Sequence, residues 1–435
     1  MGNTCANNVN PKQQVYDYNY NVSPFHMKYA LFKSDFTIQY LIGKGGFSYI
    51  YKTIHKKTHN IYAMKEMSKA SIIKRKSIDN IRNELQVLKL LKNGTFNINI
   101  KYAFHTRDSL YIITNYFTGG NLRHCIQTHY PSKHFPEQQA KFIISNILLC
   151  LEYLRVNGIV HRDIKPENLL FDNNGYLHLG DFGIARVKPF LNDNDTSGTP
   201  SYMAPEAYLN NKYSKYFQVD YFSLGVICYE LIFGRRPFHN LNANEIKQLL
   251  LTKNLQVNVD DLPRNGVYDN KDVLCDFINR LLKRKYKERM GFKRIEEIFE
   301  HEWLRDVDWE GMKAKTVKSP FVNGSVKDND GVVVKENESK VEHLVKDELQ
   351  DIRLVDKYNK QKVFDNYYFN IDYYNDCELN DHIRNTKSVI SNDYLNMKLH
   401  THYFKHSRNE SVCCIKAETS NMSCSSSSKT STNYY

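Results

Sequence analysis

The sequence has few cysteines and no long apolar run, and each absence excludes a class of protein. Its 435 residues include 9 cysteines without the spacing of metal ligands, and only Cys413 and Cys414 are neighbours. This distribution fits a reduced, intracellular protein. Because no run of about 18 apolar residues occurs, we expect no membrane-spanning helix. The residues after Met1 also lack the apolar stretch of a secretory signal, so we expect a cytoplasmic location.

The chain also lacks a concentration of charge that would indicate a particular partner. Its net charge of +12 favours nucleic acid or an anionic membrane in general terms. The basic residues are spread along the chain, however, and we find no zinc-finger or RNA-recognition motif. We therefore interpret the charge as a solvated basic surface and expect no nucleic-acid partner. An anionic membrane surface is the alternative.

Hydrophobic patterns divide the chain into a β-rich part followed by a helical part. Residues 1–34 are rich in Asn and Tyr, show no periodicity and are interpreted as an N-terminal arm. Short β-rich runs follow from Asp35 to about Lys69. A helical pattern begins at Ile78, and after Gly120 the chain is mainly helical. With 41% hydrophobic residues, enough for sizeable cores, this order predicts an α+β fold with two lobes.

The C-terminal part of the chain is less regular. Residues 338–360 carry apolar side chains at spacings of four, four and three, which predicts a short amphipathic helix docked on the core. From about Ser407 onward the chain is rich in Ser, Thr and Asn. That composition is typical of a disordered tail.

Five short motifs between Gly43 and Glu206 indicate the function. They are Gly43-Lys44-Gly45-Gly46-Phe47-Ser48, Tyr62-Ala63-Met64-Lys65, His161-Arg162-Asp163 with Asn168, Asp181-Phe182-Gly183 and Ala204-Pro205-Glu206. A single one could arise by chance, but five in this order and at these separations are typical of a protein kinase.

The chemistry of these residue types suits phosphate transfer. Glycines let backbone amides approach nucleotide phosphates, although Gly-rich hairpins are also common elsewhere. Glu84 lies on the apolar face of its predicted helix, so its buried carboxylate needs a cation. Lys65 supplies it, whereas a strand lysine alone is usually a surface residue. Asn168 and Asp181 offer oxygen ligands, which suit Mg²⁺, and Asp163 can accept the proton of a substrate hydroxyl.

The stretch from about Phe36 to Leu304 resembles the eukaryotic protein kinase catalytic domain, and its motifs resemble those of the AGC group. Within that group it is most similar to the YANK subfamily (serine/threonine kinase 32). The residues that carry this similarity are Met1-Gly2-Asn3-Thr4, Tyr62-Ala63-Met64-Lys65, Gly119-Gly120-Asn121-Leu122-Arg123, Gly234-Arg235-Arg236-Pro237-Phe238 and Asp306-Val307-Asp308-Trp309.

The resemblance implies a bilobal fold and an enzyme. It places an N-terminal lobe with one regulatory helix at 35–117, a helical lobe at 118–304, an AGC-like extension at 305–370 and the tail at 371–435. The implied activity is transfer of the γ-phosphoryl group of ATP to protein Ser and Thr hydroxyls with Mg²⁺, for which Mn²⁺ can substitute. We expect a monomer whose partners are its protein substrates.

The resemblance also assigns the residues of the site. Asp163, Lys165, Lys65 and Asn168 are catalytic, and Asn168 and Asp181 are the metal ligands. Lys165 contacts the transferred phosphate and marks Ser/Thr specificity, and Thr114 guards the back of the adenine pocket. The implied nucleotide-binding residues are Ile42, Gly43, Lys44, Gly45, Gly46, Phe47, Ser48, Ile50, Ala63, Lys65, Glu84, Thr114, Asn168 and Asp181. The regulatory candidates are Arg162, Asp195, Thr196, Ser197 and Thr199. Glu206 is expected to form a buried structural pair with Arg289.

The chain departs from the family pattern at several positions. Ser48 replaces the third glycine, and Phe222 replaces a tryptophan, which we interpret as a packing change. Asn121 stands where the family has an acidic residue that touches ribose and basic substrate side chains. Because Glu167 and Glu230 are retained, a preference for basic substrates is weakened but not excluded.

The regulatory residues and the two ends of the chain carry further expectations. Asp195 stands where many relatives have a phosphorylated threonine, so pairing with Arg162 predicts activity without phosphorylation of the activation loop. The run Phe364-Asp365-Asn366-Tyr367 is similar to the element by which AGC tails reach the nucleotide pocket. Gly2 permits myristoylation and Cys5 palmitoylation, although Ala6 departs from the usual pattern and an unmodified arm is the alternative.

The rival interpretation is a pseudokinase scaffold that binds nucleotide or partner proteins without turnover. Ser48, Asn121 and Phe222 motivate this alternative. The complete set Lys65, Asp163, Asn168 and Asp181 favours the active enzyme, because degenerate scaffolds usually lose at least one of these residues.

Overall fold

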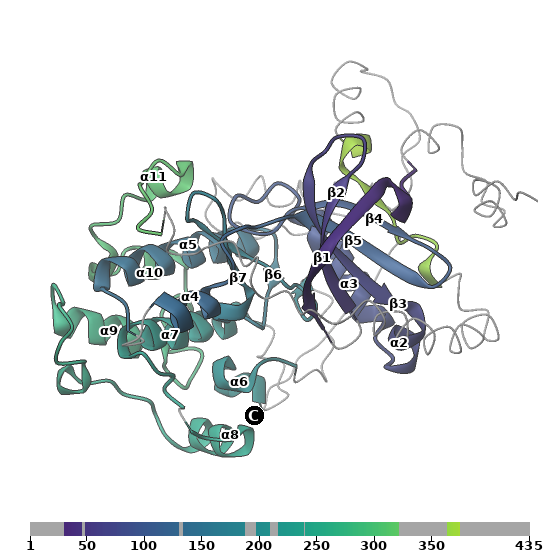
Figure 1. Ribbon diagram of the computed structural model, residues 1–435. Helices are drawn as coiled ribbons and strands as arrows, with labels where there is room; N and C mark the ends of the chain where they lie inside the picture. Colours follow the sequence, from purple (N-terminus) through teal and green to yellow (C-terminus); the bar gives the residue numbers. More distant parts are fainter. Residues whose placement is uncertain are drawn as a thin grey trace, which may run out of the picture. The chain divides into compact units, whose positions relative to one another are not determined.

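The computed structural model describes residues 30–45, 48–129, 134–187, 197–208, 216–238, 240–321 and 363–374 (Figure 1). All of them belong to one of two compact units, Met1–Thr386. The fold is mixed α+β, with a sheet in the N-terminal lobe and helices in the C-terminal lobe, as the order of the patterns predicts. None of the described helices combines the length and the apolar character needed to span a membrane.

The N-terminal lobe is built on an antiparallel six-stranded sheet in the order β1-β2-β3-β5-β4-β10. A short 3-10 helix, Lys33–Asp35, precedes β1, so regular structure begins just inside the predicted arm. The strands are β1 (Phe36–Lys44), β2 (Ser48–His55), β3 (Ile61–Ser68), β4 (Ile100–His105), β5 (Ser109–Asn115) and β10 (Phe369–Asn370).

Two helices accompany this sheet, α2 (Lys69–Lys74) and α3 (Ile78–Leu90). Ile81, Leu85 and Leu88 recur at spacings of four and three and are all buried, which explains why α3 packs against the sheet along that face. Glu84 lies on the same face and is 3% exposed. The helical spacing therefore forces a carboxylate into the interior of this lobe, as the pattern predicts.

The C-terminal lobe has two central helices, α5 (Glu137–Val156) and α7 (Gln218–Phe233). Both are buried nearly all round, which is why they lack the amphipathic stripe of surface helices. Helix α5 ends at Val156, and Gly158 just beyond it takes a left-handed φ of 68°. The other helices are α4 (Leu122–His129), α6 (Pro205–Tyr208), α8 (Ala243–Thr252), α9 (Lys271–Leu281), α10 (Glu296–Phe299) and α11 (Trp309–Ala314).

Short strand pairs and 3-10 helices in this lobe carry the candidate site residues. The antiparallel pairs are β6 (Ile159–Val160) with β9 (Arg186–Val187) and β7 (Leu169–Phe171) with β8 (Leu177–Leu179). The 3-10 helices η2 (Pro166–Asn168) and η3 (Pro200–Tyr202) follow β6 and precede α6, respectively. The segment between β6 and η2 therefore consists of residues 161–165 and contains the His161-Arg162-Asp163 motif.

The segment 363–374 corrects one expectation from the sequence. We expected Phe364–Tyr367 to reach the nucleotide pocket, but β10 pairs with β4 at the edge of the sheet opposite to β1 and β2. The side chains of Phe364, Tyr367 and Phe369 are each at most 3% exposed. Arg82 of α3 donates a hydrogen bond of 2.5 Å to Val363 O. The docked segment continues to residue 374, past the predicted boundary at 370, whereas residues 338–360 lie outside the described residues.

Candidate active site

The first part of the site is an ion pair between β3 and α3. Lys65 Nζ lies 2.6 Å from Glu84 Oε1, and the two side chains are 22% and 5% exposed. Burial lowers the pKa of Lys65, but the carboxylates of Glu84 and Asp181 outweigh it and raise that pKa above its ordinary value. Lys65 therefore remains a cation, and the predicted pairing with Glu84 is confirmed.

Helix α3 is also fixed to the C-terminal lobe, which the sequence did not indicate. Asn83 Nδ2 donates a 2.5 Å hydrogen bond to Ala185 O. Arg186 Nη2 donates to Asn80 Oδ1 at 3.0 Å. Both bonds reach the residues that follow the Asp181 motif, so the position of Glu84 is coupled to the start of the 181–206 segment.

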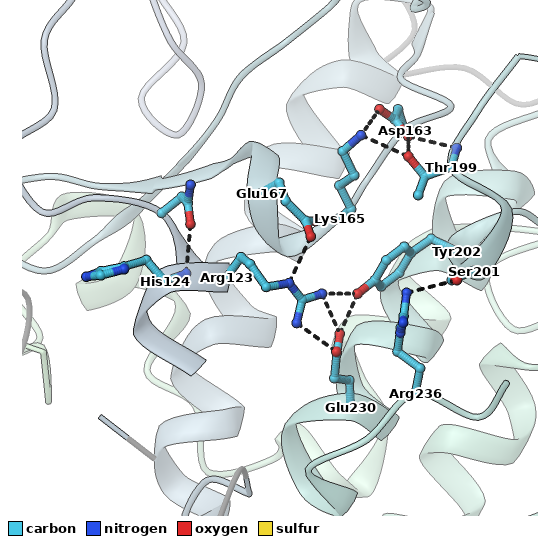
Figure 2. A network of polar contacts seen from close by, with 11 residues as sticks. Arg123, His124, Asp163, Lys165, Glu167, Thr199, Ser201, Tyr202, Glu230 and Arg236 are labelled. Carbon is cyan, nitrogen blue, oxygen red and sulfur yellow. Dashed lines mark hydrogen bonds and ion pairs between the residues drawn. The ribbon is translucent and has the colours of Figure 1, made fainter. Parts of the chain in front are cut away.

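Asp163 is held by three side chains around its carboxylate, two of which, Lys165 and Thr199, are seen in Figure 2. Its Oδ2 accepts from Lys165 Nζ at 2.6 Å and from Asn168 Nδ2 at 3.3 Å. Its Oδ1 accepts from Thr199 Oγ1 at 2.6 Å and from Thr199 N at 3.0 Å. Burial raises the pKa of Asp163, but the hydrogen bonds from Lys165 and Thr199 outweigh it and hold the pKa below its ordinary value. The carboxylate is therefore ionised at neutral pH.

The backbone around Asp163 is held in an unusual conformation by Asp220 of α7. Arg162 has a left-handed φ of 73°, a conformation that costs a non-glycine residue about 1–3 kcal/mol. The carboxylate of Asp220 accepts from the amides of His161 and Arg162, each at 2.8 Å. His161 Nε2 donates to Gly180 O at 3.0 Å, and its ring meets Phe182 edge-on at 5.0 Å. Asp220 therefore fixes the backbone of the loop, and the His161 side chain joins the loop to the Asp181 motif.

The donor atoms present at the site fit Mg²⁺. The amide nitrogen of Asn168 donates to Asp163 O at 2.9 Å, which orients the amide so that its oxygen is the remaining donor atom. Asp181 is exposed and has a left-handed φ of 57°. Among the described residues no three His, Cys, Asp or Glu side chains gather as metal ligands. One carboxylate and one amide suit Mg²⁺, which usually binds one or two protein carboxylates together with substrate phosphates and water.

The predicted nucleotide-binding residues line neighbouring strands. Ala63 lies opposite Thr114 in the β3–β5 register, and Gly43 lies opposite Ile50 in the β1–β2 register. Gly45 N donates a 2.7 Å hydrogen bond to Ser48 O, which closes the turn between β1 and β2. Ile42 and Lys44 belong to β1, whereas Gly46 and Phe47 lie outside the described residues.

The regulatory candidates fall into two groups. Asp195 and Thr196 lie outside the described residues, so their pairing with Arg162 stays a prediction. Arg162 Nη2 donates to Ser197 O at 3.5 Å. Thr199, which we placed among the regulatory residues, has its hydroxyl between Asp163 and Lys165, and Lys165 Nζ donates to it at 2.8 Å. Its contacts are those of a residue that positions Asp163, which the sequence pattern did not reveal.

The buried pair predicted for Glu206 is confirmed. Arg289 Nη1 and Nη2 donate to the two carboxylate oxygens of Glu206 at 2.6 and 3.0 Å, and the Arg289 side chain has no solvent exposure. Its guanidinium lies 5.1 Å from the centre of the Phe222 ring. The phenylalanine that replaces the family tryptophan therefore still provides an aromatic face to the guanidinium.

A family model described as the protein kinase domain matches residues 36–304, more than half of the chain. The chain belongs to the protein kinase family. In this kinase the Lys65–Glu84 pair is formed and Phe182 is buried, the arrangement that the family needs for phosphate transfer.

The kinase is also similar to curated relatives of the AGC type. The serine/threonine-protein kinase SCH9 of Saccharomyces cerevisiae is 35% identical over 68% of this chain and 35% of its own length. The RAC family serine/threonine-protein kinase homolog of Dictyostelium discoideum is 32% identical over 66% of this chain and 62% of its own length. The serine/threonine-protein kinase sgk-1 of Caenorhabditis elegans is 33% identical over 70% and 63%. The chain thus spans less than two thirds of the length of each of these relatives.

Proposed function

We propose that this chain is a serine/threonine protein kinase that transfers the γ-phosphoryl group of ATP to protein hydroxyls. The observation that carries the proposal is the state of Asp163, an ionised carboxylate held by Lys165 and Thr199. The names of the similar proteins, all serine/threonine kinases, support the same substrate hydroxyls. The pseudokinase alternative finds no support, because Lys65, Asp163, Asn168 and Asp181 are all present.

Each residue of the site then has a separate role in the transfer. Asp163 orients the substrate hydroxyl and accepts its proton as the new oxygen–phosphorus bond forms and the bond between the γ-phosphorus and the β–γ bridging oxygen breaks, so that ADP leaves. Lys65, held by Glu84, and Lys165 bind phosphate oxygens and stabilise the charge on them. Asn168 and Asp181 are the residues that would hold Mg²⁺. When bound, Mg²⁺ offsets charge on the phosphate oxygens.

The test is Mg²⁺-dependent transfer of labelled γ-phosphate onto a mixed protein substrate by the purified chain and by Asp163→Asn. We expect transfer onto Ser and Thr, reduced by about 10²–10⁴-fold in the variant because the proton acceptor is lost. Equal melting temperatures of the two proteins would show that the fold is intact. Undiminished transfer by Asp163→Asn would refute the role of this carboxylate, and nucleotide binding without transfer would support the scaffold alternative.

Finer parts of the proposal depend on the sequence. The motifs quoted above favour the YANK subfamily within the AGC type, and Asp195 favours activity without phosphorylation of the activation loop. Phosphatase treatment that abolished transfer would refute that independence. A cytoplasmic location with membrane association through Gly2 is likewise supported by the sequence alone, because residues 1–29 lie outside the described residues. Gly2→Ala should release the protein from membranes in a fractionation experiment.

A further inference from the structure

Two carboxylates close to Asp163 are occupied by an arginine of the same chain (Figure 2). Arg123, the second residue of α4, donates from Nε to Glu167 Oε1 at 2.8 Å. Its Nη1 and Nη2 donate to the two oxygens of Glu230, at the C-terminal end of α7, at 2.9 and 3.3 Å. Nη2 also donates to the hydroxyl of Tyr202, which donates to Glu230 Oε2 at 2.5 Å. The guanidinium thus uses all three of its nitrogens.

The carboxylates lie where a peptide substrate must pass. Glu167 belongs to η2, four residues after Asp163, and its side chain is 43% exposed. Tyr202 belongs to η3, which begins directly after Thr199, the residue bonded to Asp163. A substrate hydroxyl must come within about 3 Å of Asp163, so the peptide residues next to it lie over this network.

The burial of Glu230 explains why a cation is needed here. Its side chain is only 6% exposed, and a buried carboxylate without a partner is strongly destabilising. A guanidinium meets this need best, because its planar set of donors matches a carboxylate in two parallel hydrogen bonds. Without Arg123, the pair Glu167 and Glu230 would be a ready site for an arginine of the substrate. Arg123 of the same chain fills this site and leaves no carboxylate oxygen of Glu230 without a donor.

The residue at position 121 supports the same conclusion. Asn121 Oδ1 accepts a 2.8 Å hydrogen bond from His124 N and so caps the start of α4. The amide carries no charge that would attract a cation, and its oxygen is used by the helix. Arg236, which donates to Ser201 Oγ at 2.9 Å, is a separate cation beside η3 and takes no part in the network of Arg123.

We propose that Arg123 sets the substrate specificity of this kinase by filling the acidic site of Glu167, Glu230 and Tyr202. A basic side chain of the substrate is excluded from this site, so the kinase acts on Ser/Thr peptides that lack arginine next to the phosphate acceptor. This proposal depends on the proposed function. It reverses the expectation from the sequence, in which the retained Glu167 and Glu230 preserved a weakened preference for basic substrates.

The experiment compares peptide pairs that carry arginine or alanine at single positions N-terminal to one serine. For the wild type we expect a kcat/KM ratio, arginine over alanine, of one or below at every position. Arg123→Ala should raise that ratio by about tenfold or more at one position, because a substrate guanidinium can then pair with the vacated carboxylates. Glu230→Gln in the same chain should cancel the gain, because it removes the buried charge.

Two further variants keep the test decisive. Arg236→Ala is the matched control: it removes a cation next to η3 that does not contact Glu230, so the ratio should stay at the wild-type value. If Arg123→Ala does not fold, Arg123→Gln is used, since its amide can still donate to Glu230 without adding charge. A wild type that already prefers arginine, or a folded Arg123 variant with an unchanged ratio, would overturn the proposal.

Peptide binding separates this proposal from the proposed function. The same peptide pairs are labelled and their binding to wild type and Arg123→Ala is measured by fluorescence anisotropy without ATP. A chain that transfers no phosphate can still show whether the variant gains affinity for arginine peptides. Such a gain would support the role of Arg123 even if the kinase activity failed its own test, and equal affinities would refute it.

Discussion

Each lobe buries a carboxylate and pairs it with a cation of the same chain, but the two cations are held very differently. Glu206 in the C-terminal lobe meets Arg289, whose side chain is fully buried and also donates to Gln218 O at 2.6 Å and Lys283 O at 2.9 Å. Glu84 in the N-terminal lobe meets Lys65 through a single contact of 2.6 Å, and Lys65 is 22% exposed.

The difference separates a structural pair from a catalytic one. The donor groups of Arg289 are bonded to atoms inside the protein, so this side chain has no donor left for a ligand. Lys65 uses one contact for Glu84, and its ammonium group has three donors, so it can bind phosphate oxygens while the pair is kept. The cation of a buried ion pair can therefore bind phosphate only when it keeps both exposure and unused donors.

The largest effect is expected when the structural pair is broken. Arg289→Ala leaves Glu206 buried without a partner and should lower the free energy of unfolding by about 3–5 kcal/mol, measured by denaturant titration. Arg294→Ala is the control, because the Arg294–Glu300 pair is largely exposed and should give no measurable change. If Arg289→Ala were as stable as wild type, the pair would not be what holds this lobe together.

A smaller effect, on a different quantity, is expected when the catalytic pair is broken. Lys65→Met or Glu84→Gln should lower kcat/KM by about 10²–10³-fold while changing stability less than Arg289→Ala does. Glu66→Gln is the matched control, since Glu66 neighbours Lys65 on β3, pairs with Lys33 on the opposite face and should leave the rate unchanged. A large loss of stability with little loss of rate would make this pair structural as well.

The smallest effect concerns the pH dependence of the reaction. Because the pKa of Asp163 is held below its ordinary value, the base stays ionised, and activity is retained, at pH values where an ordinary carboxylate is protonated. Thr199→Val removes one donor and should move the acid limb of the kcat/KM profile to higher pH. Thr199→Ser keeps the hydroxyl and should leave the limb in place, so identical shifts in both variants would contradict the role of that hydrogen bond.

The sequence predicted the Lys65–Glu84 pair from a local pattern, whereas the Glu206–Arg289 pair, 83 residues apart, was expected from the resemblance to the protein kinase domain. The periodicity of Ile81, Leu85 and Leu88 places Glu84 on a buried face, and the motif that contains Lys65 lies on a strand beside it. The order of strands and helices was predictable for the same reason, since it depends on the spacing of apolar residues along one element.

The contacts of Arg123 with Glu167, Glu230 and Tyr202 could not be predicted from a local pattern. Arg123 and Glu230 are 107 residues apart, and their contact depends on how α4, η2 and α7 meet. The predicted location of Phe364 was also wrong, because a four-residue motif does not show which edge of a sheet a distant segment will join. Side chains that bridge elements are set by tertiary packing, which a local pattern does not contain.

The edge strand β10 has a practical consequence for anyone who shortens this protein. The family match ends at residue 304, yet Phe321 is 5% exposed among Phe135, Phe142 and Phe171, and β10 covers the outer edge of β4. A chain cut at residue 304 would expose apolar surface and an unpaired strand edge, which is a template for aggregation. The unit that expresses as a well-behaved protein therefore extends at least to residue 374.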